Sequence, residues 1–142
     1  MHTMTTTEAR RPALKDQHIT KAEPLENMAD LTEHIAEGDF LSCETASLTY
    51  VYEVLFVTPK AVTLRTTKLA DEGHYIDESF EPSECGDRVM WHTQEADPKG
   101  VCVVRRISED GTLSTAPRGH ASRLEKCMMV NGKPVTKIDW RF

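Results

Sequence analysis

The chain has 142 residues, 39% of them hydrophobic, which suits one domain with a single core and leaves little apolar material for a second. No run approaches the roughly 20 consecutive apolar residues that a membrane-spanning helix needs. The polar start of the chain also lacks the apolar stretch of a secretion signal. We therefore expect no membrane association and a cytoplasmic location.

Charge is distributed unevenly along the chain, which carries a net charge of −6. Residues 38–100 hold 12 acidic and 5 basic residues, whereas residues 101–142 hold 8 basic and 4 acidic ones. An acidic surface favours a basic protein partner and repels nucleic acid, and a basic surface does the opposite. The charge pattern therefore leaves both kinds of partner open.

The N-terminal part of the chain divides into two predicted segments. Residues 1–23 are polar and rich in threonine, without apolar periodicity, and are predicted to form a flexible arm ahead of a single β-rich domain over 24–142. Residues 24–37 then place apolar side chains at the spacing of one helix face, namely Leu25, Met28, Leu31 and Ile35. Pro24 suits the first turn of a helix and Gly38 suits the position after its end, so we expect a short amphipathic helix here.

The strongest local pattern is a predicted β-hairpin over residues 50–67, preceded by a strand over 39–44. Its residues are mostly β-branched or aromatic and are interrupted only at Thr58-Pro59-Lys60. A two-residue loop would pair Leu55 and Val57 with Leu64 and Val62, respectively. A three-residue loop would instead bring Val54 and Phe56 to Leu64 and Val62. Both faces of the first strand are apolar, so the sequence allows either register.

The remaining pattern alternates short strands with turns. An acidic loop is expected over residues 70–87, followed by strands over 88–92 and 101–108. The Glu109-Asp110-Gly111 turn should return the chain into residues 112–115, and Asn131-Gly132 should join strands over 127–130 and 135–142. The predicted fold is mainly β: a small barrel or strongly bent antiparallel sheet of six or seven short strands, with one short N-terminal helix.

Several of these segments resemble small uncharacterised proteins of bacteriophages and mobile elements. The residues that carry the resemblance are Gly38-Asp39-Phe40, Tyr52-Glu53-Val54, Val57-Thr58 with Lys60, Val62-Thr63-Leu64-Arg65, Gly119-His120-Ala121 and Asn131-Gly132-Lys133-Pro134. The polar loop at residues 42–48 departs from the family pattern. The resemblance implies a compact, SH3-like β-barrel acting in the cytoplasm of a bacterial host. It implies no activity, because none is known for the family.

The residue types suggest two possible chemical sites, a metal site and an acid–base catalytic site. The potential metal ligands His74, Cys85, His92 and Cys102 fall close together in the sequence, but no two have the short spacing of a structural zinc site. We therefore predict no metal, no cofactor and no disulfide requirement. Acid–base chemistry by Asp77, Glu78, Glu81 and Glu84 beside His74 is the second possibility, but a solvated acidic loop is the simpler interpretation. No nucleophile or phosphate-binding motif is present.

Macromolecular binding is therefore the preferred function, without enzymatic activity. A host or phage protein is expected to bind the acidic loop, with Tyr75 and Phe80 as apolar anchors and Glu78 and Glu81 as charged contacts. The alternative is a nucleic-acid-binding barrel that uses the basic last third, through Arg105, Arg106 and Arg123.

Overall fold

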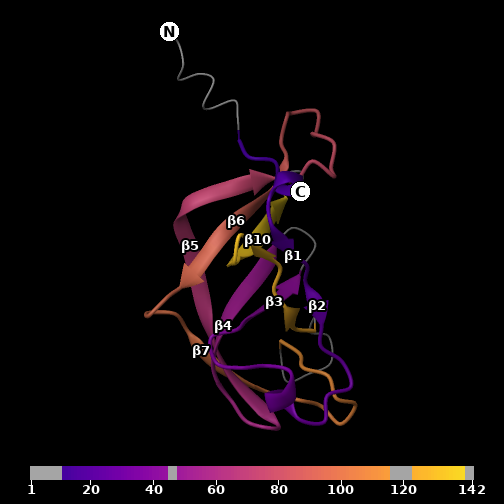
Figure 1. The fold of residues 1–142 in the computed structure, drawn as a ribbon, viewed down its shortest axis with the longest axis vertical. Coiled ribbons are helices and arrows are strands. Elements are labelled where there is room, and N and C mark those ends of the chain that lie inside the picture. Colours follow the sequence, from indigo (N-terminus) through magenta and orange to yellow (C-terminus); the bar gives the residue numbers. More distant parts are fainter. Residues whose placement is uncertain (1–10, 45–47, 116–122, 140–142) are drawn as a thin grey trace.

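The computed structural model describes residues 11–44, 48–115 and 123–139, which form one antiparallel sheet curled into a half-barrel (Figure 1). The mainly β, strongly bent fold is confirmed, but the described residues form ten strands rather than six or seven. The strands are β1 (Ile19–Thr20), β2 (Glu23–Pro24), β3 (Phe40–Glu44), β4 (Thr49–Val57), β5 (Ala61–Ile76), β6 (Val89–Ala96), β7 (Cys102–Arg106), β8 (Glu125–Lys126), β9 (Met129–Val130) and β10 (Lys133–Asp139). Four of these strands have only two residues, which is too short to leave a recognisable sequence pattern.

The long strand β5 organises the sheet. The strand order is β1-β9-β10-β6-β5-β4-β3-β8-β2, and β7 pairs separately with β5. The sheet bends until β10 approaches the start of β4, where Leu48 and Ile138 form an antiparallel bridge. The Thr136 hydroxyl also donates a hydrogen bond to the Thr49 carbonyl oxygen at this point. These contacts between strands distant in the order hold the half-barrel in its curled form.

The β4–β5 hairpin combines the two predicted registers. Val57 pairs with Val62 across the Pro59-Lys60 loop, as in the first alternative, and Val54 pairs with Leu64, as in the second. The change of register occurs between Val54 and Phe56, where β4 carries one residue more than β5. Such a β-bulge cannot be seen in a strand that is apolar on both faces, because no alternation marks the extra residue.

The predicted helix over residues 24–37 is wrong. Its four apolar residues are all buried, with exposures of 4% or less, but the backbone forms only a three-residue 3₁₀ turn, η2 (Leu31–Glu33). Asn27 has a φ of 54°, which breaks a right-handed helix. The backbone groups here bond to other loops, since Met28 N donates to Gly111 O at 3.0 Å and Leu31 N to Pro59 O at 2.9 Å. The apolar spacing therefore identified core residues and not a helix.

The segment predicted as an arm joins the sheet from residue 12 onward, so the predicted boundary at residue 23 does not coincide with the start of packed structure. The short 3₁₀ turn η1 (Leu14–Asp16) buries Leu14, and β1 pairs with β9 through Ile19 and Val130. Pro12 O also accepts a hydrogen bond from Ile76 N at 2.9 Å. The buried Leu14, the partly buried Ile19 and the pairing of β1 with β9 hold this polar segment on the sheet, although it has no periodicity of its own. The earlier residues of the arm, 1–10, lie outside the described residues.

The core consists of two hydrophobic clusters on the sheet. The larger one contains the buried side chains Leu25, Met28, Leu31, Ile35, Leu41, Cys43, Val54, Val62, Leu64, Leu113 and Leu124. The smaller one is built on Leu14, Val130 and Val135, with Tyr75 and Trp91 packed against it.

The two predicted C-terminal turns are confirmed: Ile107 bridges Leu113, and Asn131 and Gly132 both have positive φ.

The four cysteines are expected to differ sharply in reactivity. Cys85 and Cys102 are exposed, whereas Cys43 and Cys127 are buried. Burial disfavours the thiolate and raises the pKa of Cys127 from 9.0 to about 11. A thiol-specific chromogenic reagent at about pH 8 should therefore modify Cys85 and Cys102 rapidly and the buried pair only after denaturation. Peptide mass spectrometry identifies the modified residues, and rapid modification of Cys127 in the folded protein would contradict its placement.

The raised pKa of Cys127 also sets the sign of a pH effect on stability. Between pH 9 and about 11 the unfolded chain releases the Cys127 proton while the folded chain keeps it. The Cys127 contribution to the free energy of unfolding should therefore be complete below pH 9 and be lost as the pH rises toward 11. Replacing Cys127 by alanine should remove this part of the pH dependence.

Candidate functional site

The acidic loop is the most prominent projection of the described chain. It comprises residues 77–87, which with Arg88 join β5 to β6 and extend beyond the end of the sheet (Figure 1). The loop is shorter than predicted, because residues 70–76 belong to β5, where Tyr75 pairs with Trp91. A bulge between Leu69 and His74, with Gly73 at a φ of 65°, allows β5 to bend and continue.

A buried aspartate fixes the base of the acidic loop. Asp77 is 8% exposed, and its Oδ2 accepts a hydrogen bond from Trp91 Nε1 at 2.9 Å, while Oδ1 accepts from Ser79 N at 3.0 Å. Asp77 N donates to Val89 O at 2.9 Å. Because both carboxylate oxygens have partners, this side chain has a structural role and is not set up for acid–base chemistry.

The four predicted protein-binding residues are divided between the sheet and the loop. Tyr75 lies on β5, half-buried against the smaller cluster, and its hydroxyl accepts from Asn131 Nδ2 at 3.2 Å. It is therefore a core residue and is not presented by the loop. Glu78, Phe80 and Glu81 are all exposed on the loop, and 40% of Phe80 is accessible. The structure thus brings together three of the four.

A groove lies between the acidic loop and the N-terminal segment. Its volume is about 360 Å³, and it is lined by Leu14, Lys15, Ile19, Asp77, Glu78 and Ser79. Apolar side chains from the N-terminal segment line one part, and carboxylates from the loop line another. Lys15 Nζ lies 2.8 Å from Glu78 Oε2, and this hydrogen bond and charge raise the pKa of Lys15. A lysine side chain of the protein itself thus shows how a basic group is accommodated here.

The acidic loop retains a negative charge despite this ion pair. Residues 77–87 include five acidic residues and no basic residue, and Arg88 follows before β6; Glu78 is paired with Lys15. The turn at its far end is closed by hydrogen bonds between Ser83 and Asp87, with Gly86 at a φ of 83°. The loop therefore has defined local structure at both its base and its tip.

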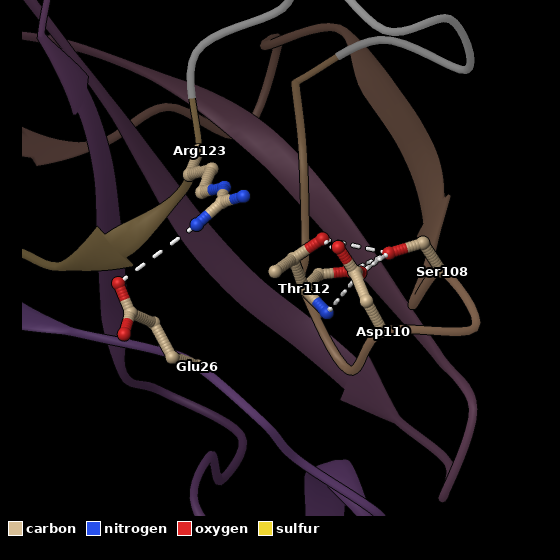
Figure 2. Close-up of polar contacts among 5 residues, drawn as sticks. All are labelled: Glu26, Ser108, Asp110, Thr112 and Arg123. Carbon is tan, nitrogen blue, oxygen red and sulfur yellow. Dashed lines mark hydrogen bonds and ion pairs between the residues drawn. The ribbon is translucent and has the colours of Figure 1, made fainter.

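The predicted nucleic-acid-binding arginines do not form one surface. Arg105 and Arg106 are adjacent on β7 and point to opposite faces of the sheet. The Arg105 guanidinium donates to Thr115 O at 2.6 Å and to Val104 O at 3.0 Å. It therefore holds the backbone at these two residues. Arg123 points toward Glu26, with Nη1 3.9 Å from Oε1 (Figure 2).

Arg123 also lies near an internally bonded turn of the chain. Asp110 Oδ1 accepts hydrogen bonds from the hydroxyls of Ser108 and Thr112, as Figure 2 shows. These two hydroxyls, more than any other group, lower the pKa of Asp110, and the charge of Arg123 contributes to the same shift. The positive charge of Arg123 is therefore partly offset by Glu26 and Asp110.

Of the four potential metal ligands noted in the sequence, the structure brings His74 and His92 together and leaves the two cysteines apart from them. Cys85 is exposed on the acidic loop and Cys102 on β7, whereas His74 and His92 are directly opposite each other on β5 and β6. Within the described ranges, no three His, Cys, Asp or Glu side chains gather around a common point. The histidine pair could not be found from the sequence, because its alignment depends on the bulge in β5.

Comparison with protein-family models, with curated proteins and with solved structures found no match to this chain. Among the residues that the structure describes, no helix has the length and apolar character needed to cross a membrane.

Proposed function

We propose that this chain is a non-enzymatic binding protein that engages a basic segment of a protein partner through the acidic loop. The observation that carries the proposal is the projection of exposed carboxylates and Phe80 beside a groove with apolar lining. A lysine or arginine side chain combines an apolar stem with a charged end, which matches this combination. The phage-type origin and the SH3-like classification implied by the resemblance remain predictions.

The anchored base of the loop supports a role in recognition. Asp77 and Trp91 hold the start of the loop, so little conformational freedom remains to be lost there on binding. The exposed carboxylates would attract a basic partner from a distance, and Phe80 would supply apolar contact area at close range. The separated positions of Arg105, Arg106 and Arg123 give less support to the nucleic-acid alternative.

Charge reversal on the acidic loop should weaken binding to basic peptides. The probes are labelled peptides rich in lysine and arginine, with acidic and neutral peptides of equal length for reference, measured by fluorescence anisotropy. The double variant Glu78→Lys/Glu81→Lys should lose affinity mainly through slower association, and the loss should shrink as salt screens the charges. Truncating Phe80 to alanine should instead speed dissociation.

A matched control is provided by Glu33 and Glu109, which are exposed elsewhere on the molecule. The variant Glu33→Lys/Glu109→Lys changes the net charge equally and should bind the basic peptides like the original protein. Equal weakening by both double variants would mean that net charge, and not the loop, determines binding. Tight binding to duplex DNA that depends on Arg106 and Arg123 but not on the loop glutamates would reject the proposal.

A further inference from the structure

The histidine pair on β5 and β6 is the least explained polar feature of the described chain. His74 and His92 are cross-strand partners, with ring centres 5.1 Å apart and ring planes inclined by 33°. Both Nε2 atoms are buried, and neither has a hydrogen-bond partner in the described part of the chain. Buried polar atoms are almost always satisfied by protein, water or an ion, so two neighbouring exceptions indicate a common missing partner.

The spacing of the rings matches coordination of one ion by both imidazoles. Zinc–nitrogen bonds are about 2.0–2.1 Å long, and a ring centre lies roughly 1.1 Å behind its nitrogen. Two imidazoles bound through Nε2 to one tetrahedral ion therefore have ring centres about 5 Å apart. The observed 5.1 Å agrees with this value.

The bulge in β5 places the two histidines opposite each other. A register continued unchanged from Leu69 and Gln94 would set Asp71 opposite His92, and the bulge in β5 replaces it with His74.

A third buried atom without a partner in the described residues belongs to Thr49, which is linked to the pair through Thr136. Thr136 is the other cross-strand neighbour of His92, and its hydroxyl donates to the carbonyl oxygen of Thr49. The Thr49 hydroxyl oxygen is itself buried without a partner in the described residues.

We propose that His74 and His92 form a binding site for a divalent transition-metal ion of the zinc, nickel and copper group. The two imidazoles supply two ligands, and water or an exogenous ligand occupies the remaining positions. A site with two protein ligands is open and binds less tightly than a structural four-ligand site. It lies on the sheet and not on the acidic loop, so this inference is independent of the proposed binding function.

Metal titration of the full chain, first treated with a chelator, tests the site. Zinc is titrated in competition with a chromogenic indicator, and cobalt is followed through its visible absorption. One ion should bind per chain, and His74→Gln or His92→Gln should each weaken binding by roughly tenfold or more. The control His34→Gln removes an exposed histidine and should leave the affinity unchanged. Chelation itself should leave the far-ultraviolet circular dichroism unchanged, because the pairing of β5, β6 and β10 is made by backbone groups and not by the histidine rings.

Nuclear magnetic resonance of the histidine rings keeps the test decisive if a variant does not fold. In the original protein, zinc should shift the ring nitrogen signals of His74 and His92 and leave those of His18 and His34 in place. Shifts confined to His18 and His34, or an absence of binding at millimolar zinc, would overturn the proposal. So would folded His74→Gln and His92→Gln variants that bind with unchanged affinity.

Discussion

Replacing Leu64 by alanine is expected to lower the free energy of unfolding by about 2–5 kcal/mol, the usual range for a buried leucine. Leu64 is 1% exposed and lies in the larger hydrophobic cluster. It pairs with Val54 on β4 and with Val103 on β7, so its side chain lies where three strands meet. Neighbours on both sides are held by strand pairing and cannot collapse into the cavity, which places the loss in the upper part of the range.

Urea denaturation followed by circular dichroism measures this loss by linear extrapolation. Leu69 provides a matched control, because it lies on the same strand and is 55% exposed. Leu69→Ala makes the same chemical change and should alter the free energy of unfolding by less than about 0.5 kcal/mol. Similar losses for the two variants would show that the buried face of β5 is assigned incorrectly.

The second large effect is expected for Gly111→Ala, in the turn after β7. Gly111 has a φ of 78°, which L-residues adopt at a cost of about 1–2 kcal/mol. A Cβ atom at Gly111 would also lie 2.7 Å from Met28 N and 2.8 Å from the Asn27 Cα. These are backbone atoms, and Met28 N donates a hydrogen bond to Gly111 O, so they cannot move away without breaking the contact between the two segments.

Gly132→Ala separates the conformational part of this effect from the steric part. Gly132 has a φ of 81°, but an added Cβ would meet no atom within 4 Å. We expect Gly111→Ala to lower the free energy of unfolding by at least about 1 kcal/mol more than Gly132→Ala does, because only Gly111→Ala adds overlap to backbone strain. Equal losses in the free energy of unfolding for the two variants, measured by urea denaturation, would show that residues 27–28 can move away from residue 111 at little cost.

Local turn chemistry made part of the fold predictable. Asn131-Gly132 and Glu109-Asp110-Gly111 both mark turns that the structure contains, because positive φ angles restrict the residue types. The spacing of Leu25, Met28, Leu31 and Ile35 identified buried residues, although hydrogen bonds to distant loops determine their backbone conformation. Such bonds depend on which segments meet, and the sequence of the segment itself carries no sign of them.

Of the candidate sites, only the acidic loop could be predicted from the sequence, because its residue composition marks it. The acidic loop follows from a run of carboxylates, and three of its four predicted contact residues are exposed on it. Tyr75 was misplaced because β5 extends further than its polar sequence indicates, through pairing with β6. The His74–His92 pair depends on a bulge whose length is set by tertiary structure, so no spacing rule could have revealed it.

The pairing of the first strands with the last has a consequence for how the protein is made. Ile19 pairs with Val130 and Glu23 with Lys126, so β1 and β2 find their partners only when residues 125–130 have been synthesised. Until then β3 also lacks β8, and Leu41 lies on a strand with an open edge. A nascent chain on the ribosome therefore exposes strand edges and apolar side chains until residues 125–130 have emerged, which favours aggregation and binding by chaperones. Chains that terminate before residue 125 should be degraded or aggregate, even though they contain most of the large cluster.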